Sequence, residues 1–302
     1  MLLAALMSGG CAGRVPPAAQ TITGDGFEHR VRVNGELRAA PLVHVYLEGD
    51  GRPFRTRHHP ASDPSPRRAL ALELMMLDPT PSLYLGRPCY DGLAQAPACH
   101  TALWTSARYS ETVIASMSAA LAALRSRYGF RAVTLIGYSG GGVLASLIAE
   151  RLPAVNGLVT LAANLDIEAW ARLHAYTPLS MSLNPAARAA LPPGIAQWHY
   201  VGSADRNVPP AQISAALAHQ PFARLRVLAG VGHVEGWVDA WPGLLLEFGG
   251  SIPAGALRRT RARRSEREPN ADFDRVGRQV GVAEQGLKRH ERGIAIVEDE
   301  AR

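Results

Sequence analysis

The feature that most constrains the fold of this chain is a serine, Ser139, inside a Gly-x-Ser-x-Gly pattern. The pattern directly follows the β-forming run 133–136, and the stretch 141–151 behind it has apolar side chains at helical spacing. A serine at the tip of such a tight strand-to-helix turn needs small neighbours, and Gly137 and Gly141 meet that need. The pattern therefore predicts a nucleophile at the end of a buried strand; a glycine-rich turn without chemistry is the alternative.

Two later segments supply the acid and the base that a nucleophilic serine requires. The β-rich run 195–201 leads into a polar loop that carries Asp205 and ends at two prolines. The alternating run 224–229 is followed by a glycine-flanked loop that carries His233. We therefore predict that Ser139, Asp205 and His233 act as one unit, with the order serine, acid, histidine along the chain.

These three residue types divide the work of nucleophilic catalysis. A serine hydroxyl is a weak nucleophile until an imidazole accepts its proton, and a carboxylate must hold that imidazole in the correct tautomer.

Asp166, which follows the preceding strand 157–163, is an alternative for the acid. We favour Asp205 because it follows the penultimate strand. Several other histidines are expected to be loop, surface or structural residues: His58, His59, His174, His199 and His219.

Acyl transfer also needs hydrogen-bond donors for the oxygen that becomes negative. The backbone N–H of Gly140, the residue after the serine, is the expected first donor. The run 42–48 breaks into Gly-Asp-Gly, and the N–H of Asp50 is the expected second donor; a hairpin turn is the alternative. Ionised carboxylates of Glu48 and Asp50 that pointed inward would oppose the developing charge. We therefore expect both to turn away into hydrogen bonds or to contact a polar part of the substrate.

With these motifs in place, the chain resembles the α/β-hydrolase family over about residues 28–250. Many members have His-Gly where this chain has Glu48-Gly49. The motifs that carry the resemblance are Gly137-Tyr138-Ser139-Gly140-Gly141, Asp205 in a Gly-x-x-Asp-x-x-Val-Pro setting, and Gly232-His233. A little-characterised bacterial subgroup of cell-envelope hydrolases is similar in two further segments, Tyr84 to Cys99 and Trp104-Thr105-x-x-Arg108-Tyr109-Ser110.

The resemblance implies both an architecture and a reaction. The fold is expected to be α/β, with a mostly parallel sheet and helices on both faces. The reaction is expected to be hydrolysis of an ester, thioester or amide bond in a small molecule, through an acyl-enzyme and without a metal or other cofactor. The alternative is a non-catalytic envelope binding protein that retains the fold. We favour the hydrolase, because a binding protein has no need of Ser, Asp and His in this order.

Length and periodicity agree with one catalytic domain. The chain has 302 residues and 47% hydrophobic content, enough for a well-buried core, which we place at residues 25–250. Strands are expected at 28–34, 42–48, 82–86, 131–137, 157–163, 195–201 and 224–229. Helices are expected at 66–77, 106–128, 141–151, 210–219 and 236–248. The alternation predicts a mostly parallel sheet. Residues 165–194 are predicted to form either a small lid or an ordinary connector.

The N-terminal residues and the cysteines indicate a cellular location. A short apolar run ending at Cys11 resembles a bacterial lipoprotein signal, with Cys11 as the lipidation site and residues 12–24 as a tether, so residues 1–24 precede the domain. Cys89 and Cys99 then remain as a pair on a loop rich in Pro, Gly and Asp. They are predicted to form a disulfide in an oxidising compartment, the periplasm; two unrelated buried thiols in a cytosolic enzyme are the alternative. No metal site is expected, because Cys99-His100 lacks a second pair at zinc spacing.

The basic character of the chain does not indicate a nucleic-acid partner. The formal net charge is +6, but nearly all the cations are arginine, which is typical of codon bias, and Lys288 is the single lysine of the sequence. The densest run, 258–264, lies in the segment 251–302, which is charged and poor in aromatic residues. We predict that this segment is a disordered basic tail that is solvated or touches anionic lipid headgroups.

Overall fold

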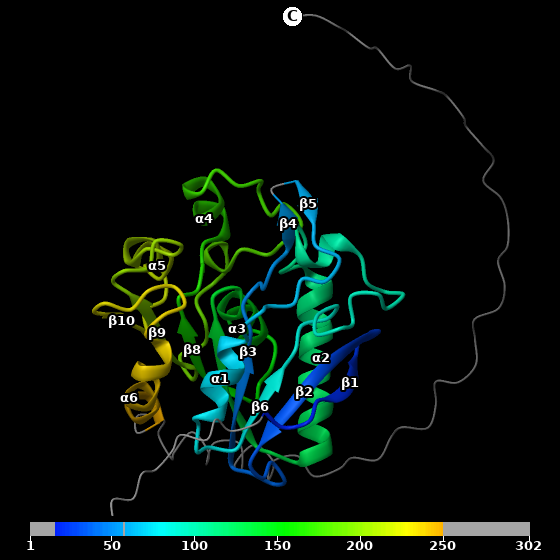
Figure 1. The fold of residues 1–302 in the computed structure, drawn as a ribbon. Helices are drawn as coiled ribbons and strands as arrows, with labels where there is room; N and C mark the ends of the chain where they lie inside the picture. Colours follow the sequence, from blue (N-terminus) through cyan, green and yellow to red (C-terminus); the bar gives the residue numbers. More distant parts are fainter. Residues whose placement is uncertain (1–15, 57, 250–302) are drawn as a thin grey trace, which may run out of the picture.

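The computed structural model describes residues 16–56 and 58–249, and a sheet of eight strands lies at its centre (Figure 1). Across the sheet the strands follow the order β1 (Gln20–Gly24), β2 (Phe27–Asn34), β6 (Ser82–Leu85), β3 (Leu42–Leu47), β7 (Ala132–Tyr138), β8 (Val155–Leu161), β9 (Ala196–Gly202) and β10 (Ala223–Leu228). The six strands from β6 to β10 are parallel, and β2 runs antiparallel to both β1 and β6. The predicted mostly parallel α/β sheet is confirmed.

Helices cover both faces of this sheet, as predicted. They are α1 (Leu70–Met76), α2 (Glu111–Tyr128), α3 (Gly140–Ala149), α4 (Ile167–Leu173), α5 (Pro210–Ala216) and α6 (Trp237–Gly249). Strand β3 shows how the two faces arise, because its side chains alternate. Val43 and Val45 join the apolar core that contains buried residues of α2 and α3, whereas Tyr46 joins the core that contains buried residues of α1 and α6.

The N-terminal boundary of the domain was wrong in the sequence analysis. Residues 20–24 were expected to belong to a tether, but they form β1 and pair with β2. The turn between these strands is Asp25-Gly26, with φ of 43° and 82°, which is the short left-handed turn that closes hairpins. Gly24 packs against α2, since a Cβ there would lie 2.2 Å from the carbonyl oxygen of Ser116. The predicted lipidation site Cys11 and the predicted tail 251–302 lie outside the described residues.

Several predicted helices begin later or end earlier than expected. Helix α2 was expected from 106 but begins after Ser110, whose hydroxyl accepts a hydrogen bond from the N–H of Val113 and so caps the helix. It ends at Gly129, which has a φ of 71° and donates its N–H to the Arg125 carbonyl. Two short 3₁₀ turns, η1 (Thr101–Trp104) and η2 (Pro185–Ala187), and a ribbon of β4 (Phe54–Thr56) and β5 (His59–Pro60) were not predicted.

The segment 165–194 contains α4 and η2 and packs on the domain. Ile167 belongs to the apolar core that contains buried residues of α2 and α3. The N–H of Leu183 donates to the Tyr109 carbonyl at 3.0 Å. Tyr176 and Met181 are exposed, at 54% and 59%. Whether the segment acts as a lid stays a prediction.

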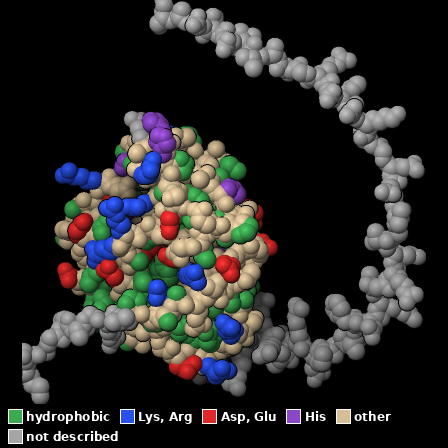
Figure 2. Space-filling view, turned by 45° about the vertical axis from the view of Figure 1, so that its right-hand side comes forward, with side chains coloured by type: hydrophobic (Ala, Val, Ile, Leu, Met, Phe, Trp, Pro, Cys, Tyr) green, Lys and Arg blue, Asp and Glu red, His purple; other side chains and the backbone are tan. Residues whose placement is uncertain are grey.

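On the face drawn in Figure 2, arginine and acidic side chains lie among one another, so this face has mixed charge. Among the helices described, none combines the length and the apolar character required to cross a membrane.

Candidate active site

Ser139 lies at the sharp turn between β7 and α3. Its φ of 51° and ψ of −123° are a strained backbone conformation for a residue with a side chain. A Cβ on Gly137 would lie 2.3 Å from the Gly141 carbonyl oxygen, and a Cβ on Gly141 would lie 2.1 Å from the Leu47 carbonyl oxygen. Glycine at both positions therefore lets the turn fold against β3, and the serine projects at the carboxyl end of the sheet.

The structure brings Ser139, His233 and Asp205 together from the loops that follow β7, β10 and β9. The Nε2 atom of His233 is 3.2 Å from the Ser139 hydroxyl oxygen, and its Nδ1 atom is 2.8 Å from the Asp205 carboxylate. Asp205 is buried, and its other carboxylate oxygen accepts hydrogen bonds at 2.8 Å from the N–H groups of Asn207 and Val208. This arrangement can move a proton from the serine to the imidazole while the carboxylate holds the ring.

Asp166, the alternative acid, has a different set of partners. Its carboxylate accepts hydrogen bonds from the N–H groups of Glu168 and Ala169, and so it caps α4. The same oxygen accepts a bond at 3.1 Å from the side-chain amide of Asn184. The hydrogen bond to His233 is made by Asp205.

Asn207 is a further member of the site that the sequence motifs do not predict. Its side-chain nitrogen is 2.9 Å from His233 Nε2, and its side-chain oxygen accepts a bond at 3.3 Å from the indole N–H of Trp170 in α4. The indole thereby orients the amide so that its NH₂ group faces the imidazole. A donor at Nε2 and an acceptor at Nδ1 both favour the neutral tautomer protonated on Nδ1, which is the form that can accept the serine proton. Sequence patterns could not predict the role of Asn207, because the residues that it contacts, Trp170 and His233, are both far from it in the chain.

The two predicted oxyanion donors, Gly140 and Asp50, belong to loops that lie close together. A Cβ on Gly49 would be 3.4 Å from the Cβ of Ser139, and a Cβ on Gly140 would be 2.0 Å from the Asp50 carboxylate. The loop after β3 therefore lies directly against the serine turn. Among the described residues, neither the N–H of Gly140 nor that of Asp50 has a hydrogen-bond partner.

Glu48 turns away from the serine, as expected. One carboxylate oxygen accepts a bond at 2.9 Å from the N–H of Ala71 in the first turn of α1, and the other accepts a bond at 3.0 Å from the N–H of Gly49. Burial of this side chain raises its pKa to about 7, against the lowering effect of these hydrogen bonds.

The raised pKa of Glu48 predicts a pH-dependent stability. In the unfolded chain Glu48 ionises near its ordinary pKa of 4.5, whereas in the fold it holds its proton to about 7. Its contribution to the free energy of unfolding is therefore complete below pH 4.5 and is lost as the pH rises through 7. We expect Glu48→Gln, which resembles the protonated acid, to flatten the fall of stability between pH 5 and pH 8, as measured by urea unfolding.

Glu73 lies in α1, the helix whose Ala71 N–H donates to Glu48, and provides a matched control because its side chain is 41% exposed. We expect the slope of stability against pH to be flatter in Glu48→Gln than in Glu73→Gln. Equal slopes for the wild type and Glu48→Gln would contradict the prediction.

The Asp50 carboxylate also turns into hydrogen bonds. It accepts bonds from Arg87 at 2.6 Å, from Arg108 at 2.8 Å and from the hydroxyl of Tyr109 at 2.6 Å. Burial would raise the pKa of Asp50, but the neighbouring charges of Arg108 and Arg87 hold it well below its usual range. From the sequence, Arg108 and Tyr109 belong only to a segment of resemblance, and Arg87 has no predicted role.

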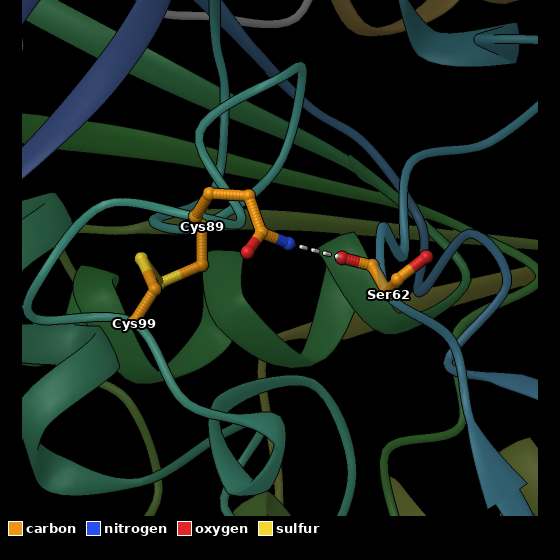
Figure 3. Close-up of a disulfide and its surroundings, with 4 residues drawn as sticks. Ser62, Cys89 and Cys99 are labelled. Carbon is orange, nitrogen blue, oxygen red and sulfur yellow. Dashed lines mark hydrogen bonds between the residues drawn. A yellow bond between two sulfur atoms is a disulfide. The ribbon is translucent and has the colours of Figure 1, made fainter.

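Cys89 and Cys99 are joined by a disulfide, with their Cα atoms 5.6 Å apart (Figure 3). The closed loop is also tied to the segment after β5, because the side-chain amide of Gln95 donates to the Ser62 carbonyl at 3.3 Å (Figure 3). Arg87 lies just before this loop and Tyr90 lies within it. The disulfide therefore anchors the segment that contacts Asp50.

Comparisons with known proteins find similar structures but no matching sequence family. No protein-family model matches the chain, and no curated protein matches it. The fold is similar to a proline iminopeptidase-related protein from Thermus thermophilus, with a TM-score of 0.55, 14% identity, and coverage of 80% of this chain and 99% of that one. It is also similar to an α/β serine hydrolase homologue from Coxiella burnetii, with a TM-score of 0.54, 12% identity, and coverage of 78% and 98%.

A third similar structure is a serine hydrolase without a lid from Xanthomonas campestris, with a TM-score of 0.52, 14% identity, and coverage of 80% of this chain and 97% of that one. At these identities the likeness concerns the fold. It agrees with the strand order, the strained serine turn and the position of the loops at the carboxyl end of the sheet. The chain has the α/β-hydrolase fold.

Proposed function

We propose that this chain is a serine hydrolase that cleaves an ester bond through an acyl-enzyme. The observation that carries the proposal is the bonded series Ser139, His233 and Asp205, with distances of 3.2 Å and 2.8 Å, on a serine held in a strained turn. Strain of this kind costs free energy and persists mainly where function requires it. The same side chains would have no evident use in a purely structural turn.

In the proposed reaction the hydroxyl oxygen of Ser139 attacks the ester carbonyl carbon while His233 Nε2 accepts the hydroxyl proton. The carbonyl oxygen becomes negative, and the N–H groups of Gly140 and Asp50 donate to it. The carbon–oxygen bond to the leaving alcohol then breaks, and His233 returns the proton to that alcohol. Water repeats the sequence on the acyl-enzyme, releasing a carboxylic acid and restoring the serine. Asp205 keeps the imidazole oriented and stabilises its cationic form throughout.

Short esters are the proposed substrates, with thioesters and amides as the alternatives. The helices of the segment 165–194 are the seven-residue α4 and the three-residue turn η2, so few residues are present there to cover a long acyl chain. One similar structure is a serine hydrolase without a lid, and another is related to proline iminopeptidase. A panel of p-nitrophenyl esters of rising chain length, run beside aminoacyl amides, distinguishes these substrate classes.

A fluorophosphonate probe tests the proposal directly. Attack by an activated serine displaces fluoride and leaves a phosphonylated serine. We expect a stoichiometric adduct that maps to the peptide containing Ser139, with no adduct in Ser139→Ala. Folded wild-type protein that stays unlabelled, and that hydrolyses none of the esters, would favour the alternative of a binding protein that retains the fold.

We further propose that the protein acts in the cell envelope, in the periplasm and anchored by lipid at Cys11. The disulfide between Cys89 and Cys99 supports an oxidising compartment, because such bonds are rare in the bacterial cytosol. Cell fractionation with metabolic labelling by a palmitate analogue tests the anchor. Labelling that is lost in Cys11→Ala is the expected result.

A further inference from the structure

The Asp50 side chain is the centre of a buried cluster beside the serine turn. Arg87 and Arg108 have side chains exposed by only 2% and 6%, and both donate to the Asp50 carboxylate. Tyr109, which is fully buried, donates its hydroxyl to the same carboxylate. Desolvation of so many charges makes a buried ion-pair cluster a poor source of stability compared with apolar packing. Its presence at this place therefore indicates a role in the geometry of the site.

The same cluster holds the backbone of residues 49–50. Arg87 donates to the Gly49 carbonyl at 3.3 Å, and the hydroxyl of Tyr90 donates to the Asp50 carbonyl at 3.1 Å. The N–H of Gly49 is bonded to Glu48. Three of the four backbone polar groups of this dipeptide are thus engaged, and the N–H of Asp50 has no partner among residues 16–56 and 58–249. A free donor on an otherwise fixed peptide is what an oxyanion site requires.

The charges of the cluster also suit an oxyanion site. A carboxylate next to a developing negative charge would raise the energy of the transition state. Here the two guanidinium groups of Arg87 and Arg108 outweigh the single carboxylate of Asp50. Because these groups are already in place before substrate binds, no reorganisation is needed when the negative charge develops.

We propose that Asp50 is a positioning residue whose carboxylate, held by Arg87, Arg108 and Tyr109, fixes the 49–50 peptide so that the Asp50 N–H faces the oxyanion of the substrate. The proposal rests on the serine-hydrolase function and adds to it the residues that set the geometry of the second oxyanion donor. Arg87 and Tyr90 act on the peptide carbonyls, and Tyr109 acts on the side chain.

Asp50→Asn in the full chain tests this role, because it retains the backbone N–H and the side-chain volume but removes the charge that both arginines hold. We expect kcat for p-nitrophenyl butyrate to fall about 10- to 100-fold, which is less than the roughly 10²- to 10³-fold loss when an oxyanion donor is removed outright, because the N–H is displaced and not deleted. KM is expected to stay nearly unchanged, because the donor acts mainly in the transition state. The inhibition constant of butylboronic acid, which forms a tetrahedral anion on serine, is expected to rise by the same factor as kcat falls.

Asp78→Asn is the matched structural control. Asp78 is also a buried carboxylate beside β3, but its side-chain partners are different: it accepts bonds at 2.6 Å from the hydroxyl of Tyr46 and from His44. We expect this variant to melt at a lower temperature while its kcat and its boronic acid inhibition stay at wild-type values. Tyr109→Phe removes one donor to Asp50 and keeps the ring. We expect it to lower kcat and to raise the inhibition constant of the boronic acid, as in Asp50→Asn but by a smaller factor. It replaces Asp50→Asn as the test if that variant does not fold.

The outcomes separate this proposal from the function on which it rests. A wild type that neither hydrolyses the ester nor takes up a fluorophosphonate removes the hydrolase function itself. An active wild type with unchanged kcat in Asp50→Asn and Tyr109→Phe overturns the positioning role and leaves the hydrolase function standing. The positioning role is also overturned if kcat falls in Asp50→Asn while the inhibition constant of the boronic acid stays unchanged. It is overturned as well if kcat falls equally in Asp50→Asn and Asp78→Asn.

Discussion

Replacing Asp205 by asparagine is expected to reduce kcat by about 10⁴-fold, the size of the effect when the same change is made in another Ser-His-Asp site. The local hydrogen bonds explain why. The N–H groups of Asn207 and Val208 both donate to one oxygen of Asp205, and the asparagine oxygen can replace it there. The asparagine NH₂ group would then face Nδ1 of His233 and donate to it. The imidazole would carry its proton on Nε2, where it cannot accept the proton of Ser139.

The matched variant is Asp166→Asn. Asparagine caps helices about as well as aspartate, so α4 should keep its start and the domain its stability. We expect kcat within about threefold of the wild type, since this carboxylate has no contact with His233 and surface capping changes are small in free energy. Steady-state ester hydrolysis and circular dichroism of both variants decide the assignment. A severe loss in Asp166→Asn together with a mild one in Asp205→Asn would reverse it.

Removal of the disulfide is expected to lower the free energy of unfolding by about 2 to 4 kcal/mol. The bond between Cys89 and Cys99 closes a short loop and so restricts the unfolded chain. The double variant Cys89→Ser with Cys99→Ser should therefore unfold at lower urea concentration than the oxidised wild type.

Treatment of the wild type with dithiothreitol provides the control for the serine substitutions themselves. Reduced wild type and the double variant are expected to unfold at similar urea concentrations. Protein taken from its native compartment is expected to show no alkylation of either cysteine by mass spectrometry. Two alkylated cysteines there would remove the disulfide from the native protein and weaken the proposed envelope location.

Much of the fold could be predicted because it follows from local patterns. Each of the seven predicted strands is present. They could be predicted because an apolar run bounded by glycine and proline can be recognised from neighbouring residues alone. The first strand, β1, is not evident from local composition, because it is defined by its pairing with β2 across the Asp25-Gly26 turn. Helix starts such as that of α2 were misplaced because a cap depends on one side chain rather than on periodicity.

The sequence by itself determined the chemistry that the site can offer, because a strained serine turn requires glycines at set positions and the partner residues follow particular strands in order. Only the tertiary structure decided which side chains meet. Asp205 rather than Asp166 contacts His233. Asn207, whose side-chain oxygen accepts a hydrogen bond from Trp170, contacts the imidazole directly. Arg87 and Arg108 both donate to Asp50. These contacts join residues far apart in the chain, and their distances depend on how strands and loops pack, which no local pattern encodes.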